Sequence, residues 1–174
     1  MKTFIAGFLF MAVASSGCGY TTGSVISSRY KTIYVPAFEN KIDYMNTDSR
    51  KLYIPQLETS VHDAIVSRYL FDGNLRVAEV GNTDLVLKGR LVSFDREELR
   101  MNETNDVKEY RLRITVGITL WDPVNEKPVW DEPSFSGEAT YYTSGPLAKS
   151  EAAAIQDALT DLARRVVART IEDW

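Results

Sequence analysis

Apolar and polar residues alternate most regularly between residues 109 and 121 of the chain. Six apolar side chains occupy every second position, and arginine, threonine and glycine fill most of the positions between them. A period of two residues is typical of a β-strand whose two faces lie in different environments. We therefore predict an antiparallel strand with one face on a hydrophobic core and the other open to solvent. Its core positions are Tyr110, Leu112, Ile114, Val116, Ile118 and Leu120.

Four further stretches have the composition of strands, because they are extended and rich in β-branched, aromatic or other apolar side chains. The first contains Pro36, which has no N–H to donate to a neighbouring strand, so we expect that end to leave the sheet or to lie on its edge. Polar and charged residues at 97–106 predict the tip of a hairpin. The four stretches are residues 32–38, 75–80, 84–96 and 127–142.

Two segments, from about residue 54 to 71 and from 150 to about 171, have the spacing of amphipathic helices. Gly73 follows the first and predicts a left-handed cap, while Ser150 can cap the start of the second. Glu151 suits the positive end of the second helix dipole. The predicted buried stripes are Leu57, Val61, Ala64 and Ile65 in the first helix, and Ile155, Leu159, Leu162 and Val166 in the second.

The order of these elements is β-α-β-β-β-β-α. Two amphipathic helices and one sheet must bury their apolar faces against each other, which predicts an α+β fold. We expect a two-layer sandwich in which two helices pack on one face of a mainly antiparallel four- to five-stranded sheet. The other face of the sheet is then left for water or for a partner.

The N-terminus has the organisation of an export signal. Met1-Lys2 is a short positive region, and the apolar stretch that follows spans roughly ten residues, too few for a membrane-spanning helix. Ser15-Ser16-Gly17-Cys18 resembles a lipobox, although Ser15 stands where leucine is usual. We predict a signal peptide at 1–17, lipidation at Cys18, a lipidated tether at 18–30 and a single α+β domain at 31–174. An ordinary signal peptide with an incidental cysteine is the alternative.

Charge and residue counts narrow the possible functions. The chain has 20 basic and 24 acidic residues, and removal of residues 1–17 takes away Lys2 alone, for a net charge of −5. This balance does not favour nucleic acid as a partner. With one cysteine and one histidine, His62, neither a metal site of the usual kind nor a catalytic triad can be assembled. We therefore expect no enzyme activity and no cofactor.

Basic residues collect on the predicted open face of the sheet. If the strands pair around a loop near Met101-Asn102, Arg90 lies opposite Arg113, and Lys88 lies on the same side. Like charges directly opposite each other destabilise a sheet, and a bound anion would relieve that cost. A phosphate-bearing ligand or an acidic partner surface is one interpretation. The other is a solvated basic face whose charge is balanced by nearby acids such as Glu109.

The chain resembles the LptE family of lipopolysaccharide-assembly lipoproteins. The similar stretches are Cys18–Tyr20, Lys31–Asn40, Glu109–Leu112 and Gly145–Lys149, and their order and spacing carry the resemblance over residues 18–174. It implies a lipid-anchored protein on the periplasmic face of the outer membrane. It also implies that the protein binds and plugs a large β-barrel translocon and assists lipopolysaccharide assembly.

Some members of that family bind lipopolysaccharide through basic residues at the end of a strand and loop. The resemblance implies that such residues here lie near the hairpin tip at 97–108, which we expect to reach deepest into a barrel or nearest the lipid. The candidates are Arg90, Arg96, Arg100, Lys108, Arg111 and Arg113.

A second resemblance points to a different partner. Residues 31–40 are also similar to the first strand of curli-secretion and peptidoglycan-synthase-activator lipoproteins, which are also β-α sandwiches on a lipid tether. One of those forms a ring channel, and the other contacts a synthase. The Ala-Lys-Ser-Glu start of the last helix fits the lipopolysaccharide-assembly lipoproteins better.

Overall fold

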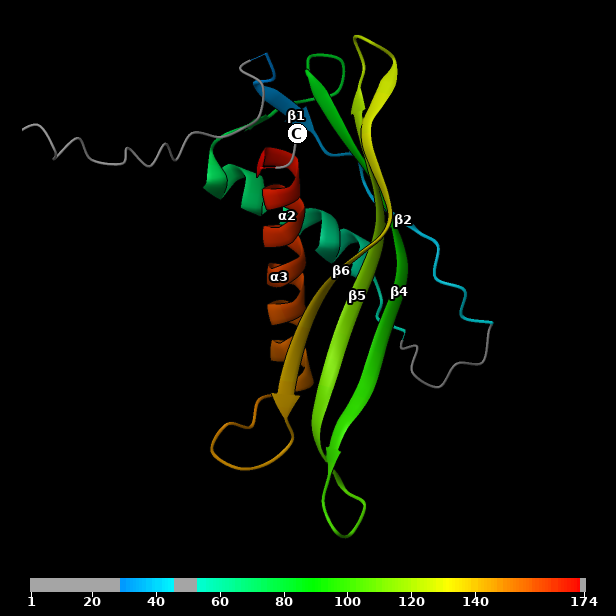
Figure 1. The fold of residues 1–174 in the computed structure, drawn as a ribbon, viewed down its shortest axis with the longest axis vertical. Coiled ribbons are helices and arrows are strands. Elements are labelled where there is room, and N and C mark those ends of the chain that lie inside the picture. The colour runs from blue at the N-terminus through cyan, green and yellow to red at the C-terminus, as the bar shows by residue number, and fades with distance from the viewer. Residues whose placement is uncertain (1–28, 46–52, 173–174) are drawn as a thin grey trace, which may run out of the picture.

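Three long antiparallel strands form the body of the protein in a computed structural model that describes residues 29–45 and 53–172. They are β4 (Leu85–Met101), β5 (Val107–Asp122) and β6 (Lys127–Tyr142), and they follow one another as a meander (Figure 1). The alternation in β5 is confirmed, because every second residue from Leu112 to Leu120 is fully buried. The bounds of β6 are those predicted, with Pro133 inside the strand.

The sheet is mainly antiparallel, as predicted, but it is mixed rather than purely antiparallel and has six strands, one more than the upper bound predicted. Three short strands, β1 (Thr32–Tyr34), β2 (Glu39–Asn40) and β3 (Arg76–Val77), pair in parallel, in the order β3-β1-β4-β5-β6 with β2 beside β4. The strand predicted at 32–38 ends at Tyr34, two residues before Pro36. Strand β2 was not predicted, since its two residues are polar and exposed.

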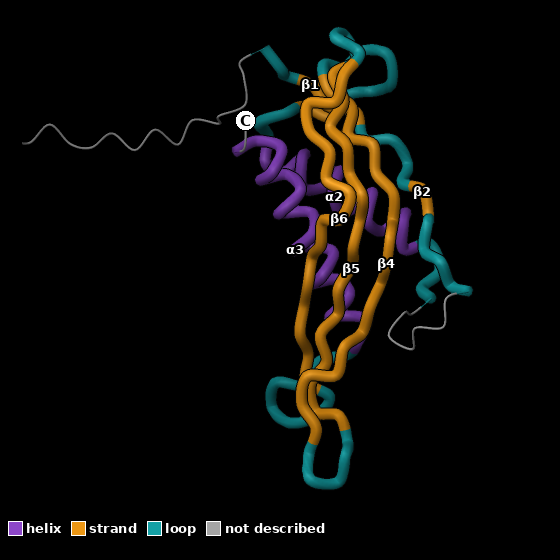
Figure 2. The backbone as a smooth tube through the Cα atoms, turned by 45° about the vertical axis from the view of Figure 1, so that its right-hand side comes forward, coloured by secondary structure: helices purple, strands orange, loops and turns teal. Residues whose placement is uncertain are grey.

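Both helices, α2 (Leu57–Asp72) and α3 (Glu151–Glu172), cover the same face of the sheet, as predicted (Figure 2). Gly73 ends α2 in the left-handed conformation at a φ of 76°, and its N–H donates to the carbonyl of Tyr69. Ser150 caps α3 by accepting a hydrogen bond from the N–H of Ala153. These contacts confirm both predicted caps.

Helix α3 approaches the sheet closely at Gly137. A Cβ atom built on this glycine would lie 2.4 Å from the Cβ of Leu162, so the absence of a side chain allows the helix to sit against β6. The predicted stripe of α3 is largely confirmed, because Leu159, Leu162 and Val166 are buried while Ile155 is half-buried. Helix α2 adds one core side chain that the sequence pattern did not single out, the fully buried Tyr69.

The pairing of β4 with β5 differs from the predicted register. Arg90 lies opposite Gly117 rather than Arg113, and Arg113 lies opposite Asp95. Strand β4 continues through the polar residues to Met101, and β5 begins at Val107. The turn between them is therefore centred further along the chain than residues 101–102. The side chain of Asn102 closes this turn by accepting hydrogen bonds from the N–H groups of Thr104 and Asp106. Like charges are therefore not opposed across these strands.

The two ends of the sheet carry different parts of the chain. The first described residues lie at the same end as the turn between β5 and β6, and the β4–β5 tip lies at the opposite end (Figure 1). The predicted signal peptide, Cys18 and the tether up to residue 28 lie outside the described residues. Neither described helix is long and apolar enough to cross a membrane.

Candidate functional site

The face of the sheet away from the helices carries three ordered rows of polar side chains. Each row crosses β4, β5 and β6 at one register position. The first row consists of hydroxyls, the second places an arginine between two acids, and the third places an arginine between an acid and a hydroxyl. The rows are Ser93–Thr115–Ser136, Asp95–Arg113–Glu138 and Glu97–Arg111–Thr140.

Two of the predicted ligand-binding arginines are neutralised within these rows. The Nε of Arg113 lies 2.6 Å from Oε1 of Glu138, and this hydrogen bond raises the pKa of the guanidinium. Arg111 reaches two acids, with 3.4 Å between its Nη1 and Glu97 and 3.6 Å between its Nε and Glu138. The open face thus carries paired charges of both signs at these positions.

Arg96 lies on the opposite, helix-facing side. A bulge between Leu91 and Ser93 shifts the alternation of β4 by one residue, so that Arg96 follows the buried Phe94 on the core side. Its Nη1 donates to Oε2 of Glu151 at 2.8 Å, and its guanidinium lies 4.9 Å from the ring centre of Tyr110. The ion pair between Arg96 and Glu151 therefore connects the start of α3 to the sheet.

Tyr141 completes this contact from β6. Its hydroxyl donates to the same oxygen of Glu151 at 3.0 Å, and its ring stacks on that of Tyr110. Burial, with this hydrogen bond, raises the pKa of Tyr141 to about 12. Neither Glu151 nor Tyr141 was predicted to hold a strand arginine, because a single-residue bulge leaves no clear mark on the sequence pattern.

The remaining three basic candidates lie at separate positions. Arg100 is exposed near the tip, with its Nε 3.6 Å from Oε2 of Glu109. In the parts of the chain that the structure describes, Arg90 and Lys108 have no carboxylate within ion-pair distance. The exposed Arg90 lies flat over β5, and its guanidinium carbon would be 2.6 Å from a Cβ atom at Gly117. The structure thus divides the six candidates among different environments.

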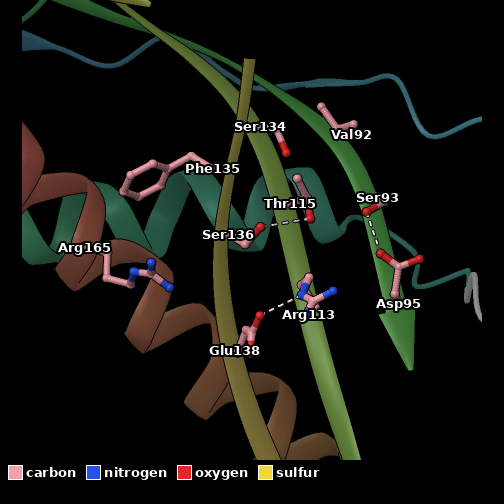
Figure 3. A pocket seen from close by; sticks show the side chains of 10 residues that line it. All are labelled: Val92, Ser93, Asp95, Arg113, Thr115, Ser134, Phe135, Ser136, Glu138 and Arg165. Carbon is pink, nitrogen blue, oxygen red and sulfur yellow. Dashed lines mark hydrogen bonds and ion pairs between the residues drawn. The ribbon is translucent and has the colours of Figure 1, made fainter. Parts of the chain in front are cut away.

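A hollow of about 580 Å³ opens where the first two rows meet (Figure 3). Short hydroxyl side chains line one part of it, and the Arg113–Glu138 pair and Asp95 line the next. It continues past Ser134 at the outer edge of β6, where Phe135 and Arg165 lie on the helix side. The sequence pattern predicted an open face but did not predict this hollow, since it depends on which short residues share a row.

Two carboxylates hold the first described residues of the domain. Asp122 is fully buried and accepts a hydrogen bond from the hydroxyl of Tyr30 at 2.8 Å. Asp84 accepts hydrogen bonds from the N–H groups of Lys31 and Thr32, at 2.8 and 3.0 Å. The N-terminal segment is thereby attached to the end of the sheet that carries the β5–β6 turn.

His62 takes part in the packing of α2. Its Nε2 lies 3.1 Å from the carbonyl oxygen of Val35, and its Nδ1 lies 2.9 Å from Oδ1 of Asp63. Residues 29–45 and 53–172 contain no group of three or more histidine, cysteine, aspartate or glutamate side chains placed to hold a metal ion.

Two helices over one face of a mixed sheet, with rows of polar side chains on the opposite face, define a class of small two-layer α+β domains. Within that class, the model of the family described as LptE, lipopolysaccharide-assembly, matches residues 30–170. The chain therefore belongs to the LptE family. A comparison with curated proteins gives no match.

Solved structures share the fold at low sequence identity. The hypothetical protein CT253 of Chlamydia trachomatis is 12% identical at a TM-score of 0.54, over 80% of this chain and 95% of that one. The PelC dodecamer of Paraburkholderia phytofirmans is 17% identical at 0.50, over 87% and 95%. The uncharacterized lipoprotein B of Nitrosomonas europaea is 9% identical at 0.50, over 82% and 83%.

Proposed function

We propose that this protein is an outer-membrane lipoprotein that binds and plugs a large β-barrel translocon and assists lipopolysaccharide assembly. The observation that carries the proposal is the match to the LptE family from residue 30 to residue 170, which spans nearly the whole described domain. In this role the protein acts by binding rather than by catalysis, and it requires no cofactor.

The attachment of the N-terminal segment supports a defined orientation. Ten residues lie between Cys18 and Arg29, and an extended chain over that span reaches about 40 Å at most. A lipid on Cys18 would therefore keep the end with Asp122 near the periplasmic face of the membrane. The β4–β5 tip lies at the opposite end of the sheet, so it is the part that we place deepest in the barrel (Figure 1).

The geometry ranks the six basic residues that we propose for lipopolysaccharide binding. Arg90 and Lys108 are the strongest candidates, since no carboxylate of the described residues lies within ion-pair distance of either. Asp106, whose pKa is lowered mainly by hydrogen bonds from Asn102 and Thr104, is nevertheless close enough to Lys108 for that charge to lower the pKa further. A phosphate would otherwise have to displace Glu138 from Arg113, or Glu151 from Arg96. Arg100 and Arg111 are candidates of intermediate strength, because their ion pairs are longer and partly exposed.

Partner identity tests the proposal. A tag would be added after Trp174, the membrane solubilised gently, and the companions of the purified protein identified and quantified by mass spectrometry. We expect one large β-barrel at a one-to-one ratio. Rings of this chain alone, or a peptidoglycan synthase, would refute the proposal in favour of the second resemblance.

The matched control is the Cys18→Ala variant carrying the same tag. Without the cysteine, the variant should be soluble in the periplasm or remain as the uncleaved precursor. Less of the barrel should then co-purify with the tagged variant from the solubilised membrane. Normal recovery of this variant from the outer membrane would overturn the lipid anchor without bearing on the fold.

A further inference from the structure

The hollow on the open face results from three short side chains in one row. Ser93 lies opposite Thr115, and Thr115 lies opposite Ser136. At this register position β4, β5 and β6 therefore all carry short side chains, which leave a depression in the surface of the sheet. The next row carries the longer Asp95, Arg113 and Glu138. Figure 3 shows the residues of both rows around one space.

The two rows offer hydrogen-bonding groups of every kind within a few ångströms. The hydroxyls of Thr115 and Ser136 lie 3.2 Å apart, and each can either donate or accept. Carboxylates only accept and a guanidinium only donates, so the Arg113–Glu138 pair presents both roles side by side. A second acceptor, Asp95, is held by the hydroxyl of Ser93 at 2.6 Å.

The charges in the hollow are balanced, and this decides which ligands fit. Two carboxylates, Asp95 and Glu138, and two guanidinium groups, Arg113 and Arg165, line it. A phosphate has mainly acceptor oxygens, so it would compete with Glu138 for Arg113 and would be repelled by Asp95. Neighbouring sugar hydroxyls can donate to a carboxylate and accept from a guanidinium at the same time. The lining therefore suits an uncharged polyol better than an anion.

The open side of the hollow leads to an apolar surface at the edge of the sheet. Beyond Ser134 lies Phe135, a half-buried ring with the guanidinium of Arg165 at 5.6 Å from its centre. A sugar ring has C–H faces as well as hydroxyls, and C–H faces pack against aromatic and aliphatic side chains. An oligosaccharide longer than one ring could thus continue from the hydroxyl row around β6.

We propose that this hollow is a binding site for an uncharged oligosaccharide segment. For the sugar chain of lipopolysaccharide the site rests on the proposed function and adds a second contact beside Arg113, whereas for a cell-wall glycan it goes beyond that function. Two saccharides share the chemistry, namely the sugar chain of lipopolysaccharide and the glycan of the cell wall.

The test titrates the full-length protein, extracted in detergent, with three probes followed by NMR of its backbone amides. The first probe is a phosphate-free oligosaccharide released from lipopolysaccharide, the second is chitotetraose as a cell-wall glycan analogue, and the third is inorganic phosphate. We expect saturable shifts of the Ser93, Thr115 and Ser136 amides with one of the saccharides and none with phosphate. The responding saccharide identifies the source.

A matched pair of variants separates binding from folding. Thr115→Val and Thr119→Val make the same change on the same face of β5, and each removes a hydroxyl that bonds to β6. Valine preserves the β-branched shape, so both variants should fold. We expect Thr115→Val to weaken saccharide binding about tenfold, as the loss of a hydrogen bond would, and Thr119→Val to leave it unchanged.

Three results would overturn the proposal: shifts with phosphate in place of the saccharides, no shifts with either saccharide, or equal binding by the two variants. The titration needs no barrel, so it can fail while the barrel still co-purifies. In the same way, loss of the barrel partner would leave the titration intact.

Discussion

The carboxylate of Asp122 is expected to be one of the largest polar contributions to the stability of this domain. It is fully buried at the end of β5, and it accepts hydrogen bonds from the hydroxyl of Tyr30, the N–H groups of Val124 and Asn125, and the side-chain amide of Asn125. Arg29 lies 3.6 Å away. These contacts hold the N-terminal segment and the β5–β6 turn together.

The size of the effect follows from the pKa of Asp122. Burial by itself raises this pKa, but the hydrogen bonds from Asn125, Tyr30 and Val124 outweigh it and lower the value to about 2 from 3.8. A difference of this size corresponds to about 2 kcal/mol of folding free energy. Asp122→Asn removes the charge and turns an N–H₂ group toward other donors, so it should cost at least about 2 kcal/mol.

The direction of the pH dependence can be worked out from the same pKa. Because the folded state has the lower pKa, the contribution of Asp122 is complete above about pH 5 and is lost as the pH falls through 3.8 toward 2. The difference in stability between the native chain and Asp122→Asn should therefore shrink over this range. The pKa of Asp84 is also lowered, by its backbone hydrogen bond from Lys31, so the native chain should lose additional stability in acid.

Urea unfolding followed by circular dichroism at several pH values measures these quantities. Asp131→Asn is the matched control, since Asp131 is exposed on β6 and bonds only the hydroxyl of Thr119 among the described residues. The control should change the free energy of unfolding by less than about 0.5 kcal/mol. Equal stability of Asp122→Asn and the control at pH 7, or a stability deficit that does not change between pH 4 and pH 2, would contradict the assigned role of Asp122.

Four further variants test the core, the helix contact and the basic residues. Ile114→Asp places an uncompensated carboxylate at a fully buried position, at a cost of several kcal/mol, and should unfold the domain; an unchanged melting curve would contradict the assigned facing of β5. Gly137→Ala should destabilise the domain by about 1–3 kcal/mol in urea unfolding, because its Cβ atom would push Leu162 away, and a neutral result would disprove the tight contact with α3. Arg90→Ser should weaken lipopolysaccharide binding in a titration more than Arg113→Ser does, and the reverse order would contradict the neutralisation of Arg113 by Glu138.

Most elements of the fold follow from patterns that are local in the sequence. The alternation in β5, the stripe of α2 and the caps at Gly73 and Ser150 each depend on a few neighbouring residues, and the structure agrees with them except that Ala64 and Tyr110 are half-buried. Binary patterning identifies which face of an element is buried, and cap residues identify where a helix ends. The class of the fold then follows from the order of the elements.

The register in which β4 pairs with β5 could not be predicted from these local patterns, because it depends on contacts between strands. Residues 97–101 are polar, and a polar run reads as a loop when a strand is expected to bury one face. Near the tip the β4 residues from Glu97 to Met101 are exposed while the facing residues of β5 are half-buried, so a polar strand is stable there. The bulge after Leu91 then moves Arg96 to the core side, and the acids beside Arg111 and Arg113 become visible only in the correct register.

The register of β4 on β5 determines how the protein can recognise a charged ligand. Arg90 lies opposite Gly117, which is nine residues from Lys108 along β5, or about 30 Å at the rise of a strand. One phosphate cannot contact both side chains, whereas lipopolysaccharide is large enough to do so. Between them the open face is occupied by paired charges and by the hydroxyl-lined hollow. A ligand that lies along this face would therefore meet Arg90 and then an electrically balanced surface, and not one continuous basic patch.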